Sequence, residues 1–448
     1  MDLVSLIPSA GNFAFTIIAF VVALSIIVTV HEYGHYIVGR WSGIKADVFS
    51  LGFGPVLASR TDRHGTQWQI AALPLGGYVR FLGDASASSA KASPDVAGMD
   101  AETRRHTMHG APLWARTATV AAGPLFNFAL AILVFAALSL IRGVAVEPPT
   151  VADLADLPPA AVAGAELAPG DTILALNGTP TPDYAAFYTV VETLPMDAPP
   201  VYTVRRDGAE REVTGPYPFP PIVASVQPQT AASDAGMRPG DVILALDGTP
   251  ISAFRELQQR VAASAGAPID VTVWRAGETL NFNLTPKSMD LPMPDGSFET
   301  RWLIGMTGGL AFESATRVPG PVEALEYGVD QLGFILQSSL SSLYHMVTGA
   351  ISSCNLSGPI GIAESSGAAA SQGLETFIWF IAMLSAAVGL LNLFPIPVLD
   401  GGHLVFYLYE GITGRPPSDR AMRFLTAAGL ALLIGLMSFA LTNDIFCP

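Results

Sequence analysis

The chain has 448 residues, of which 50% are hydrophobic and only 14% are charged, and its mean hydropathy is +0.43. This composition is typical of a membrane protein and excludes an ordinary soluble enzyme, and the length leaves room for more than one domain. The formal net charge of −15 argues against nucleic acid as a partner, because nucleic-acid-binding domains carry an excess of positive charge.

The charge is distributed unevenly along the chain. Residues 143–375 hold 26 acidic and 10 basic side chains, whereas residues 37–116 hold 9 basic and 6 acidic ones. The positive-inside rule therefore predicts that 37–116 faces the cytoplasm and that the acidic middle lies outside. The two cysteines, Cys354 and Cys447, exclude a disulfide framework and a Cys-based metal site. Both are predicted on the outer side, and they could pair or remain independent thiols.

Residues 1–40 predict the first transmembrane span. No basic segment precedes the uncharged apolar run over 13–30, so we expect a retained span rather than a cleaved signal peptide. The run leads into His31, Glu32 and His35, an H-E-x-x-H motif whose two imidazoles share one helix face. They could bind one metal just beneath the cytoplasmic surface, with the Glu beside it as a general base. The alternative is a pair of surface histidines at the helix end.

Residues 41–112 predict a cytoplasmic or membrane-associated region. Apolar residues broken by Gly and Pro over 50–83 indicate short hairpins beside the membrane. A strand over 66–81 near the metal could pair with an unwound peptide by β-addition, unless the hairpin is an ordinary cytoplasmic one. The Ala/Ser-rich stretch 85–109 predicts a mobile polar loop.

Residues 113–142 predict the second span. Near its cytoplasmic start lie Gly123, Pro124 and Asn127. Small residues let helices pack closely, and an Asn can hydrogen-bond across helices. We expect a packing role for these residues.

The middle of the chain contains an internal repeat. Residues 167–180 recur at 237–250 with 10 of 14 positions identical. Each copy predicts a turn–strand–turn unit followed by a helix and a strand, which indicates two β-rich modules over 150–218 and 219–290. Such modules usually bind an extended peptide, although rigid spacers are an alternative. Within the following region, 291–375, apolar residues at helical spacing predict an amphipathic helix on the outer surface.

Residues 376–402 predict the third span, with an apolar run over 377–398. Pro395 and Pro397 should break the helix near its end, and Asp400 follows the break. The backbone groups freed there must line a cavity or be covered. We expect a cytoplasmic loop over 403–423, and a fourth span with the C-terminus over 424–448.

The number of spans tests whether a third metal ligand is available. The first span runs inward, the second returns and the third runs inward again, so Asp400 should face the same side as His31 and His35. Catalytic zinc usually has three protein ligands and an open position, and these three residues would complete that set. Otherwise Asp400 is a helix-end carboxylate in an Asp-Gly-Gly turn.

Together these motifs resemble the site-two protease family of intramembrane zinc metalloproteases, over almost the whole chain. The matching segments are 31–35, 75–79, 122–124 with Asn127, the tandem repeat and 392–402. The resemblance implies an α-helical membrane protein with four transmembrane spans, plus a periplasmic tandem of two small β-rich PDZ domains. It also implies a multi-pass protein of the bacterial inner (cytoplasmic) membrane, with its active site near the cytoplasmic face.

The resemblance further implies a role for each matching residue. His31, His35 and Asp400 would bind Zn²⁺, and Glu32 would be the catalytic acid/base. Asn392 would help to hold the substrate backbone, and we assign further substrate contacts within the matching segments to Leu75, Gly76, Gly77, Tyr78, Pro395 and Pro397. The substrate would be a single-span membrane protein already cut by another protease, typically an anti-sigma factor in envelope-stress signalling, or a remnant signal peptide.

Two other classes of function are weaker alternatives. A membrane-anchored PDZ scaffold with a structural metal would keep its function after loss of Glu32 or Asp400. An ion or metal transporter is disfavoured, because four spans without an inverted repeat and with polar residues at one end offer no path through the membrane.

Overall fold

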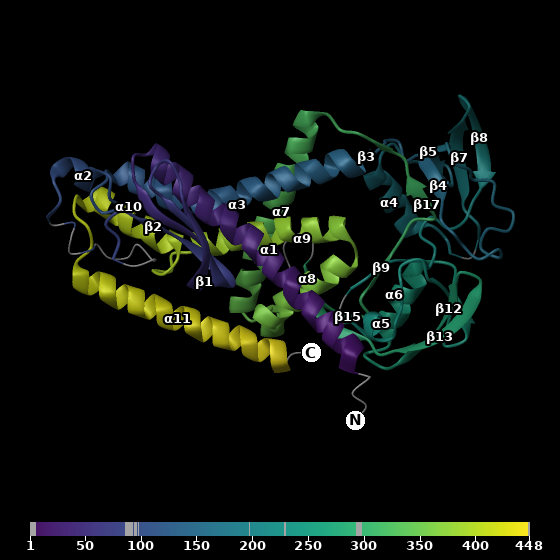
Figure 1. Cartoon of the computed structure of the whole chain (residues 1–448). Coiled ribbons are helices and arrows are strands. Elements are labelled where there is room, and N and C mark those ends of the chain that lie inside the picture. Colours follow the sequence, from purple (N-terminus) through teal and green to yellow (C-terminus); the bar gives the residue numbers. More distant parts are fainter. Residues whose placement is uncertain are drawn as a thin grey trace. The chain divides into compact units, whose positions relative to one another are not determined.

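The computed structural model describes residues 6–85, 93, 96, 98–196, 198–227, 230–292 and 298–446 (Figure 1). The chain forms two compact units. The first, here called the membrane unit, comprises 1–138, 321–344 and 353–448; the second, the repeat unit, comprises 139–320 and 345–352. Cys354 is disulfide-bonded, and Cys447 lies outside the described residues.

Four helices of the membrane unit are long and apolar enough to cross a membrane, in agreement with the four predicted spans. They are α1 (Leu6–Trp41), α3 (Leu113–Arg142), α9 (Leu374–Leu393) and α11 (Asp419–Phe446). Helix α9 ends before the predicted limit at residue 398, because Pro395 and Pro397 follow and cannot continue the helical hydrogen bonds.

The predicted loop over 403–423 is wrong for most of its length. Helix α10 (Asp400–Thr413) begins directly after the proline-containing break and ends at Gly414 in a left-handed conformation. A Cβ on Gly401 would lie 2.3 Å from the carbonyl oxygen of Leu393, and one on Gly402 would lie 2.3 Å from that of Ile396. The break therefore folds back closely over the first turn of α10, which only glycines allow.

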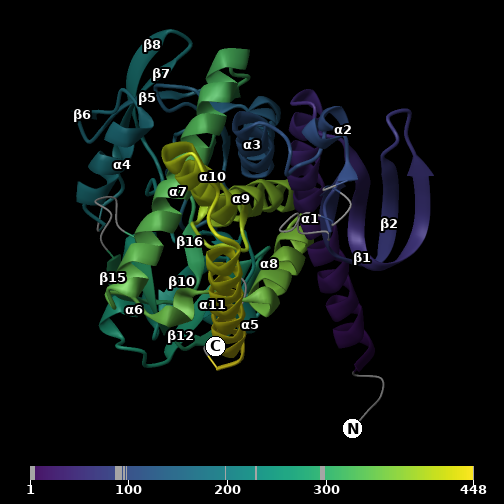
Figure 2. The same cartoon turned by 90° about the vertical axis from the view of Figure 1, so that its left-hand side faces the viewer.

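The predicted short hairpins are one long hairpin. Strands β1 (Ala46–Thr61) and β2 (Gln67–Phe81) pair antiparallel along their length with repeated shifts of register (Figure 2). The hairpin packs against α1, because Phe49 and Val79 share a buried cluster with Tyr36. In the described part of the predicted polar loop, a short helix, α2 (Ala101–Arg105), is capped by Asp100.

The predicted amphipathic helix is α7 (Pro321–Val347), but its apolar face is not simply laid on an outer surface. Leu332 is buried beside Phe135 and Trp379, which belong to α3 and α9. Helix α7 is followed by the short 3₁₀ helix η3 (Ser353–Asn355) and by α8 (Pro359–Ser371).

The repeat unit contains two four-stranded sheets with the same strand order. A helix and a strand follow each copy of the repeated motif, as predicted: α4 (Tyr184–Thr193) and then β7 in the first copy, α6 (Phe254–Ala263) and then β12 in the second. The sheets are β6–β5–β7–β8 and β11–β10–β12–β13. Their strands are Thr179–Pro180, Thr172–Leu176, Val201–Arg206 and Ala209–Thr214 in the first, and Thr249–Pro250, Val242–Leu246, Ile269–Arg275 and Glu278–Leu284 in the second.

The pattern that the two copies share has a physical basis, because each copy contains the same ion pair between a buried aspartate and an arginine. Asp171 is fully buried and accepts two hydrogen bonds from Arg206, at 2.6 Å each. Asp241 does the same with Arg275, at 2.6 and 2.7 Å. Each aspartate thereby ties the Pro-Gly-Asp turn to the end of a neighbouring strand.

A segment after the second copy connects both modules. Its strands pair antiparallel with a strand of the second module, a strand of the first and a strand that follows α3. These pairs are β16 (Met306–Gly308) with β9 (Val223–Val226), β17 (Phe312–Ser314) with β4 (Val151–Leu154), and β18 (Thr316–Arg317) with β3 (Val144–Ala145). The unit also contains α5 (Ala231–Asp234), β14 (Lys287–Pro292) and β15 (Phe298–Leu303).

Candidate zinc site

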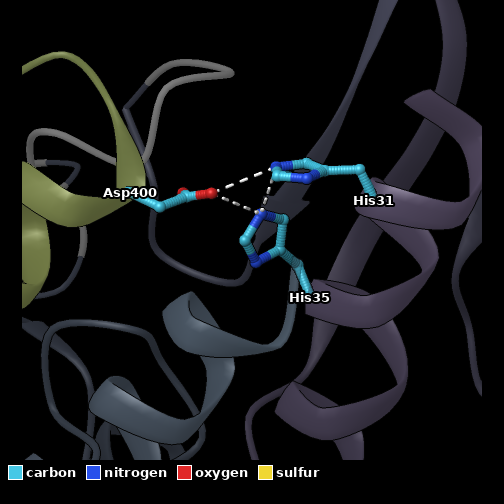
Figure 3. A group of neighbouring side chains, drawn as sticks. All are labelled: His31, His35 and Asp400. Atoms are coloured by element: carbon cyan, nitrogen blue, oxygen red, sulfur yellow. Dashed lines mark hydrogen bonds and ion pairs between the residues drawn. The ribbon is translucent and has the colours of Figure 1, made fainter. Parts of the chain in front are cut away.

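Three side chains from the two ends of the chain meet in the membrane unit (Figure 3). His31 and His35 lie one turn apart on α1, with their rings edge to face at 4.7 Å. Asp400, the first residue of α10, points its Oδ2 at both imidazoles, 3.0 Å from His31 Nε2 and 3.4 Å from His35 Nε2. The two Nε2 atoms are 3.1 Å apart.

The donor set fits a zinc ion. Ligand atoms at ~2.0–2.1 Å from a tetrahedral zinc lie about 3.3 Å from one another, close to the separations observed among these three residues. Asp400 Oδ2 is buried and accepts no hydrogen bond from any residue that the structure describes. Two imidazoles and a carboxylate are also the ligand types that zinc takes in catalytic sites, with a fourth position left open.

Helix α3 supplies the surroundings of both imidazoles. His35 Nδ1 lies 2.9 Å from the carbonyl oxygen of Thr119, and His31 Nδ1 lies 3.2 Å from the side-chain amide of Asn127. Between them, a Cβ on Gly123 would lie 2.4 Å from His35 Nε2 and 2.8 Å from His31 Cε1. The glycine therefore leaves the space that the two rings occupy.

Glu32 lies beside these ligands in a pocket of about 250 Å³. The Glu32 side chain lies against β2, since a Cβ on Gly77 would lie 3.4 Å from its Cγ. It therefore packs on the hairpin while it lines the same pocket as the two imidazoles. This arrangement suits a general base, which must reach a water molecule beside the metal.

The predicted substrate-binding residues divide into two groups. Gly77, Tyr78 and Asn392 line the pocket. Gly76, Pro395 and Pro397 are not among the described residues that line it, and their substrate contact stays a prediction. The side chain of Leu75 is outside the described part of the structure.

The positions of Gly76 and Pro397 outside the pocket lining have a structural reason. A Cβ on Gly76 would lie 2.4 Å from the ring of Phe53, so this glycine faces the opposite strand of the hairpin. Pro397 lies against Gly402 and Gly429, so it packs between α10 and α11. Both residues thus pack against neighbouring elements of the membrane unit.

Two further residues of α10 line the pocket, His403 and Tyr407, and neither was predicted from the sequence. Burial lowers the pKa of His403, more than the charge of Asp400 raises it, so this imidazole is neutral at pH 7. Burial also raises the pKa of Tyr407 to about 12. A spacing of three residues from Asp400 on one helix was the available signal for His403.

Comparison with known proteins identifies the family. The model of peptidase family M50 matches residues 19–436. The chain is a member of peptidase family M50. It is therefore a zinc metalloprotease of the site-two protease type, and its four long apolar helices are those of a multi-pass membrane protein.

Relatives of this M50 peptidase match it over nearly its whole length. A protein of Agrobacterium fabrum named as a zinc metalloprotease is 35% identical over 442 residues, which cover 98% of both chains. The regulator of sigma-E protease of Salmonella typhimurium is 33% identical over 463 residues, covering 95% of this chain and 97% of that one. The PDZ domain of an SdrC-like protein from Listeria monocytogenes matches 19% of this chain and 84% of its own, with 18% identity and a TM-score of 0.16. That likeness carries no argument about this chain.

Proposed function

We propose that this M50 peptidase hydrolyses peptide bonds within the transmembrane segments of single-span membrane proteins, with zinc held by His31, His35 and Asp400. One observation carries the proposal. The carboxylate of Asp400 meets two imidazoles that lie more than 360 positions earlier in the chain, with separations that suit one tetrahedral ion.

The chemistry follows from the groups in the pocket. Bound zinc polarises a carbonyl group and lowers the pKa of water. Glu32 takes a proton from the attacking water and delivers it to the leaving amine, since its carboxylate faces the same pocket as the ligands.

The substrate must expose its backbone before it can react, because a transmembrane helix hides its amide groups in internal hydrogen bonds. Gly77 and Tyr78, on β2, border the pocket and offer a strand to which an unwound peptide can be added. Leu75 belongs to the same strand. We assign Asn392, which also lines the pocket, to the substrate backbone.

We extend the proposal to the setting of the enzyme. The four spans would lie in a bacterial inner membrane with the zinc near its cytoplasmic face, and the two repeats would be periplasmic PDZ domains. The acidic excess of the repeat region and the positive-inside rule support this orientation. The name of the Salmonella relative supports an anti-sigma factor as the substrate. We further propose that another protease cuts this substrate first. Remnant signal peptides would be a second substrate class.

A substitution of the proposed base tests the function. Full-length protein in detergent, with Glu32→Gln as the variant, is assayed for bound zinc and for cleavage of a model single-span substrate. We expect the variant to keep zinc and substrate binding, and to lose at least ~10²-fold in cleavage rate. A chelator should abolish wild-type cleavage, and added zinc should restore it.

The same assay separates the proposal from a scaffold function. Undiminished cleavage by Glu32→Gln would refute the role of this residue. If the wild-type protein binds a metal but cleaves no substrate, while changes in the repeats remove its biological function, the chain acts as a binding protein instead.

A further inference from the structure

We propose that Asn127 is a positioning residue for the zinc site: its amide oxygen accepts a hydrogen bond from His31 Nδ1 and so keeps His31 Nε2 available to the metal. The inference rests on the proposed zinc ligands and adds to them a residue on a third helix. The sequence favoured a packing role for Asn127, which makes the two readings testable against each other.

The first step is the spacing along α3. Thr119, Gly123 and Asn127 follow one another at intervals of four residues, so they form one stripe on a helix face. The stripe faces the two imidazoles of α1, since all three of its members contact or closely approach them. Asn127 is fully buried there, with no exposed surface.

The second step is the tautomer that zinc requires. A neutral imidazole carries one N–H, and the nitrogen that binds a metal must be without it. His31 Nε2 faces both His35 and Asp400, so the proton of a zinc-binding His31 must sit on Nδ1. Histidines that bind metals almost always donate this second N–H to a neighbouring acceptor, which fixes the tautomer and the ring orientation.

The third step is to find the acceptor. For His35 it is the carbonyl oxygen of Thr119, at 2.9 Å. For His31 the polar group at Nδ1 is the Asn127 side-chain amide, placed with its nitrogen Nδ2 at 3.2 Å. Asn127 Oδ1 is buried and receives no hydrogen bond from any described residue. A half-turn of the amide, which changes its shape very little, brings this oxygen to His31 Nδ1.

A further contact holds the backbone of Asn127 from the side of α9. Ser385, fully buried on α9, donates a hydrogen bond to the backbone carbonyl of Asn127 at 3.0 Å. The backbone at Asn127 is therefore held by α9 while its side chain reaches α1. This contact provides a matched control, because removal of the Ser385 hydroxyl deletes a buried hydrogen bond at the same residue without touching His31.

The experiment compares Asn127→Asp, Asn127→Leu and Ser385→Ala in the full-length protein in detergent. Zinc affinity is measured by competition with a chromophoric chelator, and thermal unfolding is measured on the metal-free proteins. Asp keeps an acceptor for His31 Nδ1, whereas Leu keeps the approximate volume and offers none. A positioning role predicts that the Asn127→Leu variant binds zinc ~10–100-fold more weakly than wild type. The Asn127→Asp and Ser385→Ala variants should stay within a few-fold of the wild-type affinity.

A packing role predicts the reverse order of zinc affinities. Asn127→Leu would then be tolerated, and the buried charge of Asn127→Asp would be harmful. Near-wild-type zinc affinity in Asn127→Leu would therefore overturn the proposal. If Asn127→Leu does not fold, Asn127→Ala takes its place, with the same loss expected and a metal-free melting temperature compared with that of Ser385→Ala. His31→Ala serves as a reference: if it leaves zinc affinity unchanged, the proposed zinc site itself is wrong, whatever Asn127 does.

Discussion

Gly123 shows how the absence of a single side chain shapes the site. Its Cα faces both imidazoles so closely that a Cβ would lie 2.4 Å from the metal-facing nitrogen of His35. Separations below 3.0 Å require something to move, and here the neighbours are ring atoms whose positions define the donor set. A rigid pair of rings cannot give way without loss of ligand geometry.

We therefore expect Gly123→Ala to weaken zinc binding at least ~10-fold. The added methyl group would displace an imidazole, and a change in the surroundings that reorients a metal-binding histidine costs affinity on this scale. Gly435→Ala is the matched control, since Gly435 is also helical and a Cβ there would meet open space. Ala is the better helix former by about 1 kcal/mol, so the control should be neutral or slightly stabilising. Zinc affinity and melting temperature of both variants, measured in parallel, check the prediction.

Asp62 is the second residue whose surroundings determine its chemistry. It lies in the turn of the β1–β2 hairpin and accepts hydrogen bonds from the Tyr36 hydroxyl, the Trp68 indole and two backbone amides. Burial alone would raise the pKa of this carboxyl, but the hydrogen bonds outweigh it and lower the pKa to about 2. The charged form therefore stabilises the hairpin against α1.

The consequence is a pH-dependent stability. A carboxyl group whose pKa is lower in the folded state contributes stability above its unfolded pKa of ~3.9 and loses it as the pH falls toward 2. We expect Asp62→Asn to lower the free energy of unfolding by about 1 kcal/mol at pH 7, a value reduced for solvent screening of a partly exposed group. Thermal unfolding from pH 6 to 3 should show the two proteins converging. A constant difference across this range would contradict the assignment.

Among the elements, α10 depends on a link to α3. Arg116 donates to both carboxylate oxygens of Glu410, at 3.0 and 2.6 Å, and its guanidinium lies 5.2 Å from the ring centre of Tyr407. The side chains are only 15% and 19% exposed. Because Asp400 starts α10 and α3 carries Thr119 and Gly123, this pair holds the carboxylate ligand against the helix that orients the imidazoles.

We expect Glu410→Ala to destabilise the protein by about 3 kcal/mol, because a mostly buried Arg116 is left without its partner. Zinc affinity should fall several-fold as α10 loosens. The exchange Arg116→Glu with Glu410→Arg should recover part of both losses, since the pair would be restored in reverse. Chemical unfolding and zinc competition measure these quantities. If the exchanged variant loses as much stability and zinc affinity as the two single variants together, the link between α10 and α3 does not depend on this ion pair.

The membrane unit as a whole is assembled from distant segments that meet at three proposed ligand atoms. His31 and His35 come from the first helix, and Asp400 follows the break after the third apolar helix. An ion bound by all three joins both ends of the chain. Its binding free energy therefore adds to the folding free energy of this unit.

We expect chelation of zinc to lower the melting temperature of the membrane unit by several degrees and added zinc to restore it. At free zinc a hundred-fold above Kd, binding stabilises the folded state by about 2.7 kcal/mol. A His31→Ala, His35→Ala double variant should melt at the same temperature with and without chelator. Calorimetry of the three samples checks the prediction, and an equal response of the double variant would mean that the metal binds elsewhere.

The sequence by itself predicted most of the elements and the three proposed zinc ligands. Four apolar runs, a histidine pair at helical spacing and a repeated turn–strand motif depend on local periodicity and composition, which a chain carries wherever it folds. The Asn177–Gly178 and Asp247–Gly248 turns were predictable for the same reason: all four residues have positive φ, from 45° to 78°, which Asn, Asp and Gly tolerate best. The parity of the spans also predicted that Asp400 lies near the two histidines, where the structure has it.

Tertiary structure alone decided what lies against what. The sequence around Asn127 and Gly123 does not predict that they face His31. Helix packing brings α3 to α1 from almost a hundred positions away in the chain. The helix after Asp400 was missed for a related reason: the two prolines stop α9, but the glycines that let the chain fold back make room for α10. Contacts between distant segments depend on shape, and shape appears only when the chain has packed.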